Sequence, residues 1–127
     1  TFSTCGPASA ATLLRGMGNG ATERELAREC FTSRSGTEIW YLMRALRRRG
    51  FEVRVEIQRP ERLTPPSPAV AGVRVPGGAG HFIAIVSQSH GQVTIVDPLK
   101  GRMVIPQTAL ASAYRFTGFF LAVHPRG

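Results

Sequence analysis

Cysteine, histidine and acidic side chains are all scarce in this sequence. Its 127 residues include two cysteines, three histidines and eight acidic residues, against sixteen basic ones. Two cysteines allow at most one disulfide, they form no C-x-x-C pair, and the histidines are not spaced like zinc ligands. These absences argue against a disulfide scaffold and a zinc site, so we expect neither a metal nor another cofactor.

Long hydrophobic runs are absent as well. The longest apolar runs, at residues 82–86 and 116–123, fall far short of the roughly 20 residues that a membrane-spanning helix needs. No segment reads as a signal or transit peptide. The chain begins at Thr1 without a methionine, which is consistent with removal of an upstream part by processing or cloning. The compartment stays open, with a periplasmic or exported location slightly favoured over a cytoplasmic one.

Apolar residues make up 43% of the chain, which is enough for one core. The length predicts a single domain spanning residues 1–127, with a helical part at about 1–50 and a sheet part at about 51–127. We expect this domain to be a monomer.

The net charge of +8 suggests an anionic partner, such as nucleic acid, an anionic membrane surface or an acidic polypeptide. The one dense basic cluster is Arg44, Arg47, Arg48 and Arg49, at the end of an expected helix. Cations interact favourably with the carbonyl end of a helix dipole. Proteins that bind nucleic acid normally also have aromatic residues interleaved with the basic ones, or a known motif, and neither appears here. A solvated helix end is therefore the preferred interpretation, and a nucleic-acid or anionic-surface adaptor is the weaker alternative.

Hydrophobic periodicity divides the chain into helices followed by strands. The expected helices are 5–15, 22–31 with a capping box, and one from Thr37 to a stop at Gly50. The expected strands are 51–57, 69–75, 81–87, 92–97, 103–105 and 117–123, with a short helix at 107–113. Helices first and a mostly antiparallel sheet afterwards indicate an α+β fold.

Cys5 stands where a reactive cysteine would be useful. At the start of a helix, the positive end of the dipole and the unpaired backbone N–H groups favour the thiolate. By itself, a cysteine in such a place is more often structural than catalytic. Cys30 lies inside the expected amphipathic helix 22–31, where a lone cysteine is usually a small buried hydrophobe.

His81 and Asp97 form the second candidate feature. The strands that contain them are expected to form a hairpin whose turn is 88–91. A turn centred on Ser89 would make His81 and Asp97 directly opposed partners, with side chains on one face about 5 Å apart at Cβ. A shift of the turn centre by one residue would weaken this pairing.

Each of the two residues has an ordinary interpretation when taken alone. His81 could belong to the loop that begins at Gly77, and Asp97-Pro98 is a common strand exit. Together they are harder to dismiss, because both sit in strands otherwise built for a core. A carboxylate beside an imidazole would hold one tautomer and stabilise the imidazolium, so Asp97 is the expected orienter and His81 the expected base. His90, in the turn, and His124, near the C-terminus, are poorer candidates.

Several segments, in this order, resemble the bacteriocin-processing, or double-glycine, cysteine peptidases of the papain-like clan. They are Cys5–Ser9, the capped helix 22–29, Gly36-Thr37, Pro68–Val70, His81–Ile85, Val93–Pro98 with Gly101, and Gly118–Leu121. The resemblance implies a papain-like fold and hydrolysis of a peptide bond through a thioester, using Cys5, His81 and Asp97. Family members either are fused to export transporters, where they trim leader peptides after a glycine pair, or stand alone. This chain resembles the stand-alone kind, with a leader-bearing or secreted polypeptide as its expected substrate.

One departure from the family pattern concerns the oxyanion site. The family usually carries a glutamine six residues before the nucleophile, and that position falls upstream of Thr1. Losing one oxyanion donor typically lowers the rate by roughly 10²–10³. The alternative is thus a weak or inactive member that binds a leader or partner peptide in the same groove. Acyl transfer to an amine is a further alternative, because an amine can intercept a thioester.

Overall fold

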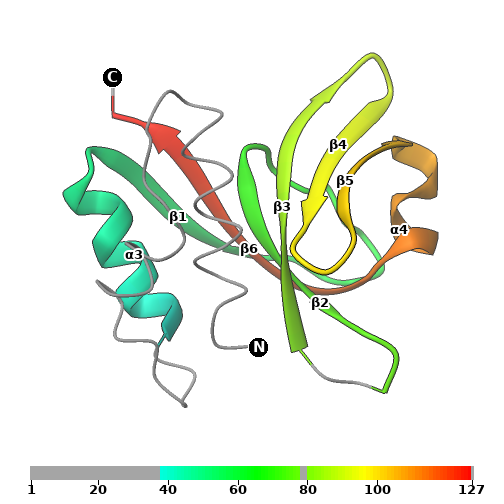
Figure 1. Ribbon diagram of the computed structural model, residues 1–127, viewed down its shortest axis with the longest axis horizontal. Coiled ribbons are helices and arrows are strands. Elements are labelled where there is room, and N and C mark those ends of the chain that lie inside the picture. The colour runs from blue at the N-terminus through cyan, green and yellow to red at the C-terminus, as the bar shows by residue number, and fades with distance from the viewer. Residues whose placement is uncertain (1–37, 78–79, 127) are drawn as a thin grey trace.

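The protein contains an antiparallel sheet in which the last strand of the chain lies between the first and the second. The computed structural model describes residues 38–77 and 80–126 (Figure 1). The elements are α3 (Glu38–Arg48), β1 (Phe51–Ile57), β2 (Ala69–Arg74), β3 (Gly80–Ser89), β4 (Gln92–Asp97), β5 (Gly101–Pro106), the 3₁₀ turn η1 (Gln107–Ala109), α4 (Leu110–Ala113) and β6 (Arg115–Pro125). Six strands pair in the order β1-β6-β2-β3-β4-β5. The expected α+β class is confirmed, and each strand expected from the sequence is present.

The two faces of the sheet carry separate apolar clusters. One cluster joins α3 to β1 and to neighbouring strands, through Leu42, Leu46, Phe51, Val53, Val70, Leu121 and Val123. The other lies on the opposite face with α4, and its largest members are Ile83, Ile85, Ile95, Phe116, Phe120 and Tyr114. In Figure 1, α3 lies beside β1 and α4 lies near β5, at opposite ends of the sheet. His81 lies on the same face of the sheet as the second cluster, because the side chains of residues 81, 83 and 85, two apart along β3, point to the same side.

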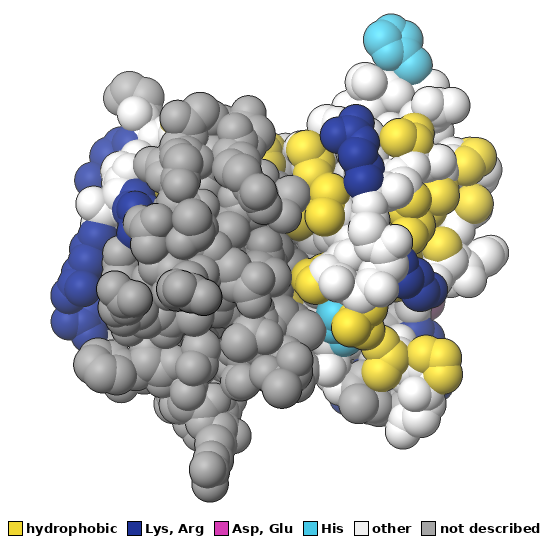
Figure 2. Space-filling view, viewed as in Figure 1, with side chains coloured by type: hydrophobic (Ala, Val, Ile, Leu, Met, Phe, Trp, Pro, Cys, Tyr) yellow, Lys and Arg dark blue, Asp and Glu magenta, His cyan; other side chains and the backbone are white. Residues whose placement is uncertain are grey.

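Helix α3 separates its apolar and basic side chains cleanly. Leu42 and Leu46 are buried against the sheet, whereas Arg44, Arg47 and Arg48 are exposed. The helix ends before Gly50, whose φ of 88° suits glycine. Basic side chains gather along this edge of the molecule in Figure 2. These three arginines thus lie at an exposed helix end, while Arg49 is half-buried. The preference for a solvated helix end over an anionic partner stays a prediction.

The register of the β3–β4 hairpin differs from the one expected. The turn consists of His90 and Gly91 alone, both with positive φ (54° and 75°), and Ser89 pairs with Gln92. Two-residue turns of this kind match the twist of the flanking strands better than the four-residue turn that we expected. The direct pairing of His81 with Asp97 was therefore wrong as a statement of register.

A β-bulge in β3 places His81 and Asp97 on the same face of the sheet. The register shifts between Ile85 and Ser87, so that Ile85 pairs with Ile95 and Ala84 with Val96. Without this extra residue, the pairing at the turn would continue and put Asp97 opposite Ala84, on the face away from His81. A one-residue slip moves a whole strand to the other face, so the bulge is what brings the two side chains to one side.

Some expectations fall outside the described residues. The helices 5–15 and 22–31, and with them Cys5 and Cys30, belong to this group. Within the part that the structure describes, no helix is long and apolar enough to cross a membrane.

Candidate active site

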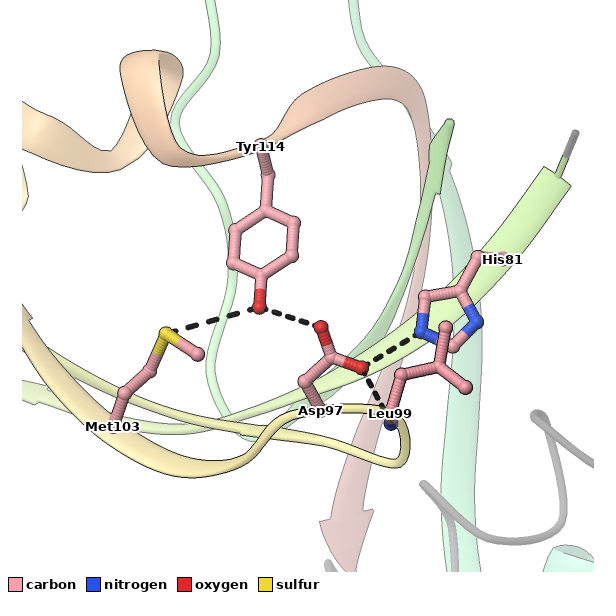
Figure 3. A network of polar contacts seen from close by, with 5 residues as sticks. All are labelled: His81, Asp97, Leu99, Met103 and Tyr114. Atoms are coloured by element: carbon pink, nitrogen blue, oxygen red, sulfur yellow. Dashed lines mark hydrogen bonds and ion pairs between the residues drawn. The ribbon is translucent and has the colours of Figure 1, made fainter. Parts of the chain in front are cut away.

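His81 and Asp97 touch in the interior of the protein. His81 Nε2 lies 2.8 Å from Asp97 Oδ1, and the two side chains are 3% and 2% exposed (Figure 3). Among the described residues, they are the buried polar or charged side chains. A buried charged group is costly unless it is paired and hydrogen-bonded. Because His81 and Asp97 are paired with each other by a hydrogen bond, both groups can be buried.

The contact runs diagonally across the β3–β4 ladder. Continuing the register one pair beyond Ala84–Val96 places Asp97 opposite Ile83, so that His81 is the diagonal neighbour on the same face. Diagonal neighbours lie about 7–8 Å apart at Cα, within reach of long side chains. On its other side, His81 pairs with Val73 of β2. The imidazole therefore projects from a strand that is held on both edges.

Asp97 receives hydrogen bonds on both of its carboxylate oxygens. The Leu99 N–H donates to Oδ1 (2.8 Å), and the Tyr114 hydroxyl donates to Oδ2 (2.7 Å). The Lys100 N–H also bonds the Asp97 carbonyl oxygen (3.0 Å), which closes a turn directly after β4. An aspartate that caps its own turn through the N–H two residues on is a common turn device. The turn, the neighbouring strand and the segment after α4 together fix the carboxylate (Figure 3).

These contacts set the protonation state of Asp97. Burial alone would raise the pKa of this carboxyl group. The hydrogen bonds from His81, the Leu99 N–H and Tyr114, together with the charge that His81 carries when protonated, outweigh burial and lower the pKa below its usual value. Asp97 therefore stays ionised at neutral pH.

The geometry also assigns the two ring nitrogens of His81. Because Nε2 faces an ionised carboxylate, which only accepts hydrogen bonds, the ring proton of the neutral imidazole belongs on Nε2. Nδ1 is then the ring nitrogen that accepts a proton.

Tyr114 is a permanent donor to the carboxylate. Burial, and then the hydrogen bond to Asp97 and its negative charge, raise the pKa of the Tyr114 hydroxyl well above its ordinary value. Sequence reasoning missed this residue. Tyr114 falls between the helix expected at 107–113 and the strand expected from residue 117, and no local pattern links it to a carboxylate 17 residues away.

A mainly apolar cavity of about 210 Å³ opens beside His81, where β2, β3 and β6 meet. Its lining is Gly72, Val73, Arg74, Gly80, His81, Phe82, Thr117 and Phe119. Gly72 allows β2 and Thr117 to approach each other closely in this lining, because a Cβ at position 72 would lie only 2.8 Å from Thr117 Oγ1. The cavity is large enough for a few small side chains or a short stretch of backbone next to the imidazole.

The remaining histidines lie away from this site. His90 is exposed at the tip of the β3–β4 hairpin, and His124 is exposed on β6, opposite Glu52 of β1. Within residues 38–77 and 80–126, no group of three or more histidine, cysteine or acidic side chains is placed to hold a metal ion. The structure thus brings together two of the three expected site residues, and the third, Cys5, lies outside its description.

Comparison with known proteins decides the family. The model of the Peptidase C39 family matches residues 2–127. The chain belongs to this family. Among relatives, it is 34% identical over 122 residues to an uncharacterized protein of Methanothermobacter marburgensis and 32% identical over 124 residues to one of Methanothermobacter thermautotrophicus. In both cases the match covers 94% of this chain and 80% of the relative.

Solved structures share the fold of this C39 member. A double-glycine-motif protease from an AMS/PCAT transporter, crystallised with its leader peptide, matches with a TM-score of 0.73 and 26% identity, covering 95% of this chain and 84% of that one. The peptidase domain of Streptococcus ComA, a bifunctional ABC transporter of a quorum-sensing pathway, matches with a TM-score of 0.74 and 21% identity over 98% and 93% of the chains. The papain-like C39 fold expected from the resemblance is confirmed.

Proposed function

We propose that this C39 family member is a cysteine peptidase that hydrolyses a peptide bond of a leader-bearing or secreted polypeptide. Cys5 is the nucleophile, His81 the base, and Asp97 the residue that orients the imidazole. The observation that carries this proposal is the buried His81–Asp97 contact of 2.8 Å, in a chain that matches a peptidase family over residues 2–127.

The chemistry follows from the assignment of the ring nitrogens. His81 Nδ1 takes the proton of the Cys5 thiol, and the thiolate attacks the carbonyl carbon of the scissile bond. The carbon–nitrogen bond breaks, the amine leaves with the proton from the imidazolium, and a thioester remains on Cys5. Water then attacks the thioester while His81 takes its proton, which returns to the Cys5 sulfur as the carboxylic acid leaves. The charge of Asp97 stabilises the imidazolium formed in each half of the reaction.

The substrate class rests on two supports. The solved neighbour at 26% identity is a double-glycine-motif protease bound to a leader peptide. The cavity beside His81 has a volume of about 210 Å³ and is mainly apolar, and Gly72 and Thr117 lie close together in its lining. Small residues next to the scissile bond fit such a space, so we expect cleavage after a glycine pair.

Selective alkylation tests the nucleophile and its base. The wild-type protein is treated with iodoacetamide at neutral pH, and mass spectrometry follows the labelling of Cys5 and Cys30 separately. We expect Cys5 to be labelled much faster than Cys30, because an activated cysteine reacts as the thiolate. His81→Gln should remove this advantage, whereas His124→Gln, which changes an exposed histidine in the same way, should retain it.

Two results would contradict the proposal. Equal and slow labelling of both cysteines in the wild type would show that Cys5 is not activated. Fast labelling of Cys5 that survives His81→Gln would show that His81 is not its base. Tight binding of a double-glycine leader peptide in the first case would favour the alternative, a family member that binds the peptide without cleaving it.

A further inference from the structure

The oxygen of Asp97 that faces away from His81 is held by one side chain. Asp97 Oδ1 receives two donors, His81 Nε2 and the Leu99 N–H, both at 2.8 Å. Asp97 Oδ2 receives the Tyr114 hydroxyl at 2.7 Å. From these contacts, we propose that Tyr114 is a positioning residue of the active site, which fixes Asp97 so that His81 keeps its proton on Nε2. This inference rests on the proposed function, because it assigns Tyr114 a part in the same reaction.

Removing the Tyr114 hydroxyl would leave Asp97 Oδ2 without a hydrogen bond from any described side chain. Asp97 is 2% exposed, so water has little access to compensate. A buried acceptor without a donor costs free energy, and the cost is larger for a charged group. The carboxyl group can then respond by rotating about its Cβ–Cγ bond or by binding a proton. Either response weakens the hydrogen bond that orients the imidazole.

The position of Tyr114 is fixed from several sides. Its backbone N–H bonds the Leu110 carbonyl oxygen at 3.1 Å, which makes Tyr114 the C-cap residue of α4. Its ring packs at 6.2 Å, centroid to centroid, from Phe116. Lys100 Nζ lies 5.5 Å from the ring centroid and comes from the same turn that follows Asp97. The hydroxyl is therefore aimed at the carboxylate by the end of α4, by the packing on Phe116 of β6 and by the aspartate turn.

The ordinary interpretation of Tyr114 is a core aromatic whose hydroxyl has found a convenient acceptor. Its 8% exposure and its place in an apolar cluster fit that description. The same hydroxyl also lies 3.8 Å from Met103 Sδ, a weak acceptor. The short contact to a charged oxygen distinguishes the two interpretations, since hydrogen bonds to ionised acceptors are shorter and stronger than neutral ones. A tyrosine that only fills the core contributes to the stability of the protein, whereas a tyrosine that positions Asp97 also changes the rate of the chemical step.

The kinetic test compares Tyr114→Phe with Val93→Ala. Tyr114→Phe removes only the hydroxyl, and we expect kcat for cleavage of a double-glycine leader peptide to fall about tenfold or more with KM unchanged. Val93→Ala removes buried methyl groups from the same apolar cluster and leaves the Asp97 hydrogen bonds intact. It should lower the melting temperature while retaining kcat. An equal loss of kcat in both variants would show that Tyr114 acts only through packing.

A double-mutant cycle isolates the route through Asp97. In an Asp97→Ala background the hydroxyl has no carboxylate to hold, so adding Tyr114→Phe should change kcat no further. A second loss of similar size in this background would overturn the proposal.

Nuclear magnetic resonance of the His81 ring gives a readout that does not need cleavage. In the wild type, we expect a protected Nε2 proton and nitrogen shifts of a single tautomer. Tyr114→Phe should speed exchange of that proton with water about tenfold or more, and Val93→Ala should not. Unchanged exchange in Tyr114→Phe would overturn the positioning role even if the enzyme is active. If the wild type fails to cleave or to label Cys5, the proposed function fails, and the ring signals still decide whether Tyr114 fixes the pair.

Discussion

Asp97 and His81 are hydrogen-bonded at 2.8 Å although they are not partners in the β-ladder. The bulge between Ile85 and Ser87 puts them on one face, and the diagonal geometry separates their backbones. The imidazole and the carboxylate, rather than the two backbones, bridge that separation. This arrangement leaves room on Asp97 for two more donors, the Leu99 N–H and the Tyr114 hydroxyl.

We expect the negative charge of Asp97 to contribute more to catalysis than the shape of its side chain. Asp97→Asn keeps the size of the side chain but removes the charge that stabilises the imidazolium. We expect kcat for peptide cleavage to fall on the order of 10²–10⁴-fold. Glu52→Gln is the matched control, because Glu52 is exposed and its ion pair with Arg54 is long, at 3.9 Å. Retention of near wild-type kcat in Asp97→Asn would be incompatible with the orienting role.

The lowered pKa of Asp97 predicts a loss of stability in acid. The folded state holds this carboxyl group ionised more firmly than the unfolded state does, so its contribution is present above the unfolded pKa of about 4 and is lost as pH falls through the folded pKa. The difference in unfolding free energy between wild type and Asp97→Asn should therefore shrink as pH falls below about 4. Urea unfolding at several pH values measures it, and a difference that grows in acid would contradict the assignment.

The raised pKa of Tyr114 predicts the opposite dependence in alkali. The folded state keeps this phenol protonated, so its contribution is present below the unfolded pKa of about 10 and is lost as pH rises toward the folded pKa. Wild type should lose more stability above about pH 10 than Tyr114→Phe does. Ultraviolet absorbance should show that the Tyr114 phenolate forms only as the protein unfolds. A phenolate that forms at about pH 10 in the folded protein would refute this.

Gly118 is predicted to be a position that accepts no side chain. Its φ is 96°, and a Cβ there would overlap the carbonyl oxygen of Gln58. Gly50 has a similar φ of 88° but open space around it. Gly50→Ala should cost only the left-handed backbone penalty of about 1–2 kcal/mol, and Gly118→Ala distinctly more.

Gly118 also lies between Thr117 and Phe119, which line the cavity beside His81. Gly118→Ala should therefore raise KM for the leader peptide as well as lower the melting temperature. Equal unfolding free energies for the two alanine variants would show that the overlap is relieved at no cost.

Much of this fold could be predicted because local patterns and the fold agree. The alternation of apolar and charged residues over Phe51–Ile57 gives β1 with the same bounds as expected. The stop at Gly50 and the paired titratable residues in β3 and β4 were also readable from the sequence. In each case, the deciding signal lies within a few residues of the element itself.

The remaining features depend on contacts that no local pattern encodes. The hairpin register was misplaced because the turn lies at His90-Gly91 instead of being centred on Ser89. A bulge at Val86 also leaves no mark in a run of β-branched and apolar residues. Tyr114 reaches Asp97 only because α4 ends beside the β4–β5 turn. The aspartate turn had a usable signal, since Asp followed by Pro often bonds its own backbone two residues on. The place of β6 between β1 and β2 is a property of the whole sheet.

Mass spectrometry of a double-glycine leader peptide incubated with the protein tests the central claim most directly. The full-length chain with Cys5 intact should release a fragment that ends in the second glycine. Cys5→Ala should release none, and Cys30→Ala should cleave at the wild-type rate. Cleavage by Cys5→Ala at an undiminished rate, or no cleavage by the folded wild-type protein, would contradict a peptidase that uses Cys5, His81 and Asp97.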